Sequence, residues 1–230
     1  MAKKKETDIT DINIEEAYSK TEKFVNDNSL IMTIVIGAIF VVIGGYFGWS
    51  RFYVEPLEKE AQGVIFKAQI YFEKDSMSLA LEGDGDNMGF LDIIDEYKYT
   101  KAANLSKYYA GICYMKQGEF ETAIDYLKSF SVNDEIVSSL ALGLIGDAYM
   151  ELGQTEKGIS FYNKAANENS NDFSAPIFLM KKALALEQEE RYEEAIEVYE
   201  RIKSDYPDSP EGQQIEMFIT RVTSKNANQS

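Results

Sequence analysis

Histidine is absent from this chain of 230 residues, and cysteine occurs once, at Cys113. The lack of histidine excludes histidine-based acid–base catalysis, histidine-dependent triads and histidine metal ligands. A single cysteine excludes an intramolecular disulfide and a cysteine zinc cluster. Cys113 falls at a helix-packing position of the repeats described below, so a buried thiol is favoured over a nucleophile. We therefore expect no enzyme, no catalytic residue and no cofactor.

Basic residues are also scarce, with 23 Lys and Arg against 39 Asp and Glu and a formal net charge of −16. This balance argues against nucleic acid as a partner, because nucleic-acid binding needs clustered Lys and Arg. Acidic pairs such as Glu193 and Glu194 have the spacing of solvated helix faces. The acidic stretch 82–89 resembles the start of a calcium loop, but Met88 occupies a ligand position. We expect a solvated turn there and no metal site.

Charge is missing altogether from Leu30 to Trp49, a run of twenty residues. A helix of this length spans the ~30 Å hydrocarbon core of a bilayer. A cleaved signal peptide would have a shorter apolar run and small residues after it, whereas Phe52 and Tyr53 follow here. A buried core helix is disfavoured because the run is apolar on every face. The sequence predicts an uncleaved transmembrane helix over residues 30–49.

Glycines mark one face of this helix. Gly44 and Gly48 form a G-x-x-x-G pair, and Gly37 lies two turns earlier on the same face. Small residues let another transmembrane helix approach closely, which predicts helix packing through this face. The alternative is that glycine is simply common in membrane helices.

The tail over residues 1–29 carries five lysines, against three Lys or Arg in the twenty residues beyond the helix. The whole-tail count favours a cytoplasmic tail, while the residues nearest the helix give no preference. Ile14 to Val25 shows apolar residues at three- and four-residue steps. This spacing predicts a short amphipathic helix, with a frayed lead-in as the alternative.

From residue 104 onward the chain repeats itself. Gly111, Gly146 and Ala183 begin equivalent segments 35 and 37 residues apart. A period near 34 with recurring small, aromatic, Gly, Ala and Pro positions is typical of tetratricopeptide repeats. The small residues would let two antiparallel helices meet, and Gly118 and Gly153 would form the turns between them. Glu190 stands where the third turn would have glycine.

The predicted organisation is therefore all-α, one transmembrane helix followed by a tetratricopeptide-repeat (TPR) helical solenoid. The predicted segments are a tail with a short amphipathic helix (1–29), the transmembrane helix (30–49), a linker helix and degenerate N-terminal repeat or cap (50–103), three repeats (104–138, 139–175 and 176–208), a C-terminal capping helix (209–222) and a disordered tail (223–230).

Repeat solenoids bind partners through a concave surface lined by the first helix of each repeat. The positions that would face this groove are Tyr108, Ile112, Met115, Leu140, Asp147, Met150, Met180 and Leu184. Methionine and tyrosine suit adaptable binding of apolar partners. The alternative is that some of these side chains pack against the next repeat.

The arrangement resembles the YfgM family. The resemblance rests on Thr21-Glu22-Lys23-Phe24, on Gly44 to Trp49, on Phe90 to Tyr97 and on Ala102 to Gly111. It implies a single-pass protein of the bacterial inner membrane, with its N-terminus in the cytoplasm and its repeats in the periplasm. It also implies an ancillary subunit of the Sec translocon that partners the membrane-anchored chaperone PpiD and helps to receive emerging polypeptides. The repeats here follow the tetratricopeptide pattern more clearly than better-known members do.

Two functions of different class follow. The first is a translocon-associated module for protein–protein interaction. The second is a structural scaffold in envelope assembly, either of outer-membrane proteins or in cytochrome maturation. Assembly lipoproteins of the second class carry a lipidated N-terminal cysteine, which this sequence lacks.

Overall fold

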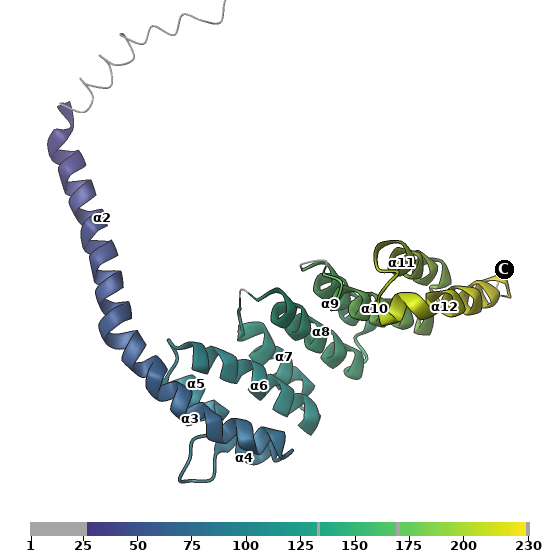
Figure 1. The fold of residues 1–230 in the computed structure, drawn as a ribbon, viewed down its shortest axis with the longest axis horizontal. Coiled ribbons are helices and arrows are strands. Elements are labelled where there is room, and N and C mark those ends of the chain that lie inside the picture. The colour runs from purple at the N-terminus through teal and green to yellow at the C-terminus, as the bar shows by residue number, and fades with distance from the viewer. Residues whose placement is uncertain (1–26, 133, 169–170, 229–230) are drawn as a thin grey trace, which may run out of the picture. The chain divides into compact units, whose positions relative to one another are not determined.

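The computed structural model describes residues 27–132, 134–168 and 171–228, and these residues form helices without any β-strand (Figure 1). The all-α class predicted from the sequence is confirmed. The chain divides into two units, Met1–Glu55 and Pro56–Ser230. The amphipathic segment expected over residues 14–25 lies outside the described residues.

The first unit contains α2 (Ser29–Trp49), followed by a π-helical segment η1 (Ser50–Val54). Among the described residues, none of either element is buried. Arg51 forms an ion pair with Glu55. In the described part of the chain, the helical stretch that includes α2 is the only one long and apolar enough to cross a membrane, judged by length and composition.

The second unit begins in α3 (Glu55–Glu73), followed by the short helices α4 (Met77–Glu82) and α5 (Phe90–Glu96). Pro56 is the second residue of α3 and follows directly after η1, so the helical stretch that begins at Ser29 runs through this proline to Glu73 without a break. Ala61, Ile65 and Ala68 of α3 are buried. The helix α4 was not predicted.

The acidic loop between α4 and α5 is a turn ordered around Asp84. Its carboxylate accepts hydrogen bonds from the backbone N–H groups of Asp86 at 3.0 Å and Asn87 at 2.7 Å, and from the Tyr71 hydroxyl. The Tyr71 hydrogen bond, followed by those of Asn87, lowers the pKa of Asp84 well below its usual range. These hydrogen bonds order the loop through partners within the chain.

Three helical hairpins follow in order. They are α6 (Lys101–Gln117) with α7 (Phe120–Ser129), α8 (Glu135–Glu151) with α9 (Thr155–Asn167), and α10 (Ala175–Gln188) with α11 (Tyr192–Asp205), and the two helices of each hairpin lie side by side (Figure 1).

The predicted role of the small residues is confirmed at two hairpins. A Cβ on Gly111 would lie 2.6 Å from the Leu127 side chain, and one on Gly146 would lie 2.7 Å from the Tyr162 ring. Glycine at these positions is therefore what allows α6 to meet α7 and α8 to meet α9.

The turns inside the hairpins have left-handed backbone. Gly118 has φ 79° and Gly153 has φ 67°, as expected for glycine after a helix C-terminus. Glu190 takes the same conformation with φ 58°, although its Cβ makes this unfavourable. The third hairpin thus keeps the turn geometry of the other two in spite of its residue type.

The last helix, α12 (Pro210–Ala227), begins at an N-cap where the Ser209 hydroxyl accepts from the Gly212 N–H at 2.9 Å. The predicted end at Val222 and the predicted disordered tail from Thr223 are wrong for the residues up to Ala227, which are helical. The extra turn presents Lys225 to Glu187 of α10 at 3.2 Å, and this contact holds it in place.

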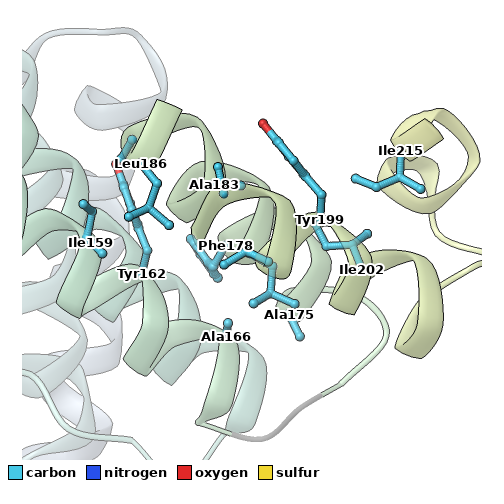
Figure 2. Packing of buried hydrophobic residues seen from close by; sticks show 14 of the residues in the cluster. Ile159, Tyr162, Ala166, Ala175, Phe178, Ala183, Leu186, Tyr199, Ile202 and Ile215 are labelled. Carbon is cyan, nitrogen blue, oxygen red and sulfur yellow. The ribbon is translucent and has the colours of Figure 1, made fainter. Parts of the chain in front are cut away.

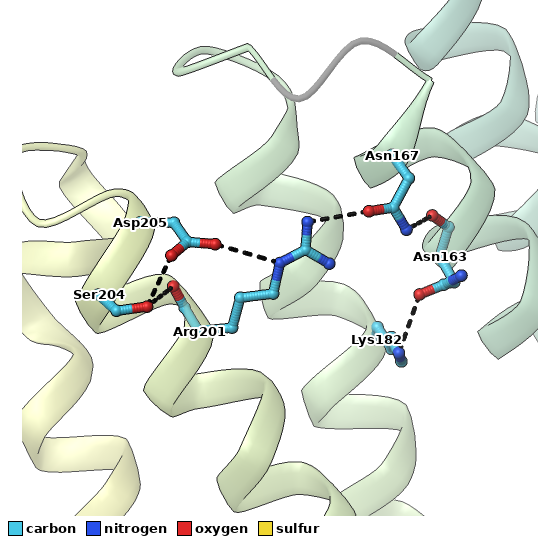
Figure 3. Close-up of polar contacts among 6 residues, drawn as sticks. All are labelled: Asn163, Asn167, Lys182, Arg201, Ser204 and Asp205. Carbon is cyan, nitrogen blue, oxygen red and sulfur yellow. Dashed lines mark hydrogen bonds and ion pairs between the residues drawn. The ribbon is translucent and has the colours of Figure 1, made fainter. Parts of the chain in front are cut away.

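A continuous hydrophobic core joins α9, α10, α11 and α12, with Tyr199, Leu179 and Ile215 among its fully buried members (Figure 2). A polar network also crosses these helices (Figure 3). Arg201 of α11 donates to the Asn167 side chain of α9 at 2.9 Å, and Lys182 of α10 donates to Asn163 of α9 at 3.0 Å. The second and third hairpins and α12 are therefore held together by one core and by polar contacts.

Candidate functional site

The eight residues predicted to line the groove lie on the first helix of each hairpin. Seven of them are half-buried, and Leu184 is 42% exposed. Three of the eight, Met115, Asp147 and Met150, line a single surface hollow of about 470 Å³ together with Phe120, Glu151 and Tyr162. The structure thus brings together the predicted residues at the ends of α6 and α8.

Met150 owes its position in this hollow to a glycine on the neighbouring helix. A Cβ on Gly158 of α9 would lie 2.5 Å from the Met150 sulfur. Gly158 stands where the repeat pattern has alanine, and the space that it leaves is occupied by the Met150 thioether. The departure from the pattern therefore shapes the wall of the hollow.

Asp147 is the charged centre of the hollow's inner side. Both of its carboxylate oxygens accept from Lys181 of α10 at 2.7 Å, and one also accepts from the Tyr162 hydroxyl of α9 at 2.7 Å. Burial and then the hydrogen bond to Asp147 raise the pKa of Tyr162 far above its usual range. Asp147 consequently links α8, α9 and α10, and its charge is compensated within the chain.

The other predicted residues have separate surroundings. Tyr108 packs its ring 5.3 Å from that of Phe130, and burial, followed by the neighbouring Tyr109, raises its pKa. Leu140 and Met180 pack against the core of α9 to α12. For Leu140 and Met180, these contacts agree with the alternative stated from the sequence, that some of the predicted groove residues pack against the next repeat. Ile112 is half-buried, and Leu184 has the largest exposed fraction of the set.

Sequence reasoning missed a second charged cluster, centred on Glu187 of α10, whose side chain is only 6% exposed. Glu187 accepts from the Tyr199 hydroxyl at 2.6 Å, from Arg221 at 2.5 Å and from Lys225 at 3.2 Å. Burial alone would raise the pKa of Glu187, but the hydrogen bonds from Tyr199, Arg221 and Lys225 outweigh it and leave the pKa lowered. A carboxylate thus joins α10, α11 and α12.

The connection after α7 leaves two further hollows, of about 320 and 560 Å³, which share Phe130, Ser131 and Val132 as lining residues. The helix that precedes them, α7, has 10 residues, whereas α9 has 13 and α11 has 14. The Asn104 side chain holds the connection with two hydrogen bonds: its NH₂ group donates to the Ser131 carbonyl at 2.6 Å, and its carbonyl oxygen accepts from the Ser131 N–H at 3.2 Å.

The three glycines of α2 that were expected to pack against another transmembrane helix have empty space beside them. A Cβ on Gly37, Gly44 or Gly48 would meet nothing of the described chain within 4 Å. Packing inside the described chain therefore does not require glycine at these positions.

Reactive groups are few in the described residues. Cys113 is fully buried, and burial raises the pKa of its thiol to about 12. No three His, Cys, Asp or Glu side chains gather in a way that would hold a metal ion, within the ranges that the structure covers.

Comparison with protein families matches the tetratricopeptide repeat over residues 106–133 and again over residues 144–210. Comparison with curated protein sequences gives no match. The chain therefore contains tetratricopeptide repeats, and no catalytic family is among the family matches.

Solved structures with the same fold include two of the nearly identical TPR-like repeats of a candidate kinesin light chain from Podosopora anserina. They are 14% and 15% identical over 74% of this chain, cover 89% and 88% of their own chains, and have TM-scores of 0.56 and 0.55. A structure of MamA is 17% identical over 74% of this chain and 89% of its own, with a TM-score of 0.51. At these identities the likeness shows the fold alone. The fold is a TPR helical solenoid with one long apolar helix before it, as predicted.

Proposed function

We propose that this chain is a membrane-anchored module for protein–protein interaction, in which α2 crosses the bilayer and the tetratricopeptide repeats bind protein partners. One observation carries the proposal: a repeat solenoid follows a 21-residue apolar helix, and the described residues of the chain bury no part of that helix. A helix that is apolar on all sides needs lipid or other protein around it. The repeats supply the binding surface.

The finer proposal follows the resemblance to the YfgM family. It places α2 in a bacterial inner membrane, the N-terminal tail in the cytoplasm and the repeats in the periplasm. There the protein would be an ancillary subunit of the Sec translocon that meets a PpiD-like chaperone and emerging polypeptides. The open glycine face of α2, formed by Gly37, Gly44 and Gly48, supports contact with a neighbouring transmembrane helix.

Photo-crosslinking in intact membranes tests this proposal. A photoreactive amino acid replaces Gly44 in one variant and Ile39, on the opposite side of α2, in the matched control. We expect adducts with translocon subunits or a membrane-anchored isomerase from position 44, and fewer from position 39. If neither position yields such adducts, the translocon assignment is wrong. Adducts with outer-membrane assembly or cytochrome-maturation proteins would favour the structural scaffold instead.

Protease treatment tests the orientation. Protease added from the periplasmic side is expected to digest the repeats and to leave a fragment that contains the tail. Protection of the repeats would reverse the orientation while leaving the membrane anchor in place.

A further inference from the structure

The C-terminal end of α8 differs from those of the other repeat helices in its charge. The helices α6, α7, α9, α11 and α12 each have a lysine in the last turn, which suits the negative end of the helix dipole. The last turn of α10 has none, but Arg221 and Lys225 reach its Glu187 from α12. The last turn of α8 also has none, and it ends at Glu151.

Glu151 receives no cation from the described part of the chain, where its exposed carboxylate makes no hydrogen bond or ion pair. The one nearby acid that is compensated is Asp147, which binds Lys181 through both oxygens. An acid at a helix C-terminus is unfavourable, because its charge adds to the partial negative charge of the last carbonyl groups. This end of α8 is therefore complementary to a positive group from outside the chain.

The hollow beside Glu151 has the shape and lining for the rest of such a group. Its volume of about 470 Å³ is lined by the apolar side chains of Met115, Phe120 and Met150, and also by Tyr162 and the two acids Asp147 and Glu151. Long basic side chains bury their methylene stems against apolar surfaces while the charged head remains near water. Methionine adapts its shape to such a stem.

We propose that this hollow binds a lysine or arginine side chain of a partner polypeptide, with the stem against Met115 and Met150 and the charged head at Glu151. The proposal rests on the proposed function as a protein-binding module, and it specifies the partner chemistry: an extended segment in which a basic residue lies among apolar ones. Selection comes from the uncompensated end of α8, which favours a basic side chain over a neutral one of similar size.

A binding experiment with the full-length chain in lipid nanodiscs tests the proposal. The probes are two fluorescent 12-residue peptides of Ala, Leu and Ser that differ only in a central Arg or Gln, and the readout is fluorescence anisotropy. For the wild type we expect the Arg peptide to bind about fivefold more tightly at low salt, the strength of a partly exposed ion pair. The preference should shrink in 0.5 M salt because the charges are screened.

Glu151→Gln should reduce the Arg-to-Gln preference to about one, whereas Glu193→Gln, which makes the same change of net charge at an exposed site on α11, should leave it intact. Gly158→Ala displaces Met150 and should weaken the binding of both peptides. Equal binding of the two peptides to the wild type, or a preference that survives Glu151→Gln, would overturn the basic-residue site and leave the binding module standing. If neither peptide binds while the photoreactive group at position 44 still forms adducts, the basic-residue site is likewise overturned and the binding module stands.

Discussion

Replacing Glu187 by glutamine removes the negative charge that joins α10, α11 and α12. In the wild type the carboxylate accepts from Tyr199 at 2.6 Å, from Arg221 at 2.5 Å and from Lys225 at 3.2 Å. Glutamine keeps the length of the side chain and one acceptor oxygen, but its NH₂ group faces cationic donors. We expect α12 to be held less firmly and the unfolding free energy to fall.

The size of the effect follows from the exposure of the partners. A hydrogen bond to a charged group contributes ~1.5–3 kcal/mol when it is buried. The side chains of Arg221 and Lys225 are 42% and 48% exposed, so they regain water when the carboxylate is lost. The net loss is therefore about 2 kcal/mol, which lowers the melting temperature by roughly 4–8 °C in a unit of this size. Circular dichroism of the full-length protein in detergent measures it.

The stabilisation also depends on pH. The pKa of Glu187 is lowered on folding from the ordinary 4.5, so the folded state binds this proton less strongly than the unfolded state does. Its contribution is fully present above pH 4.5 and is lost as the pH falls through the folded pKa. The difference in stability between the wild type and Glu187→Gln should therefore be largest near pH 7 and shrink below pH 4.5.

The matched control is Glu189→Gln, which removes a charge from an exposed residue two positions away. Its stability should stay within about 0.5 kcal/mol of the wild type. The reasoning is refuted if Glu187→Gln is as stable as Glu189→Gln at pH 7, or if the difference between them is the same at pH 7 and pH 3.5.

Three further predictions concern the repeats. Glu190→Gly should raise the unfolding free energy, measured by urea titration, by about 0.5–1 kcal/mol, because it relieves the left-handed backbone strain at some cost in backbone entropy. Glu190→Ala keeps this strain and should give no gain in the same titration. Gly146→Ala should destabilise the fold by ~1–3 kcal/mol in thermal melts, because its Cβ would lie 2.7 Å from the Tyr162 ring. The control Gly63→Ala in α3, which has open space around the new Cβ, should be neutral or stabilising. An equal effect of the two substitutions would contradict the packing argument. Cys113 should react with iodoacetamide at pH 8 far more slowly in the native chain than in urea, since its thiol is buried with a pKa of about 12, and equal rates would show that the site opens.

The hairpins could be predicted from the sequence because their signals are local or periodic. Gly111 and Gly146 were expected to allow two helices to meet, and the Leu127 and Tyr162 side chains fill the space where a Cβ would lie. The left-handed turns at Gly118 and Gly153 follow from the conformational freedom of glycine. Such features depend on residues that are close along the chain or repeat at a fixed spacing.

The contacts around the candidate site could not be read in the same way, because they depend on how one hairpin packs on the next. Met150 enters the hollow only because Gly158 of the neighbouring helix α9 leaves room for its side chain. A usable signal was nevertheless present. Asp147 and Lys181 are 34 residues apart, as are Glu187 and Arg221, so opposite charges one repeat period apart indicate ion pairs between neighbouring hairpins.

The same one-period spacing has a consequence for how the stack comes apart. Each of these pairs joins a hairpin only to its immediate neighbour, as expected for a nearly one-dimensional array. When α12 detaches, Glu187 loses its ion pairs with Arg221 and Lys225, and Tyr199 loses its contact with Phe218. The hairpin of α10 and α11 then becomes the end of the stack and is itself less firmly held. Unfolding from the C-terminus therefore proceeds one helix or hairpin at a time. A deletion preserves the pairing of the remaining charged residues only if it removes a whole repeat period.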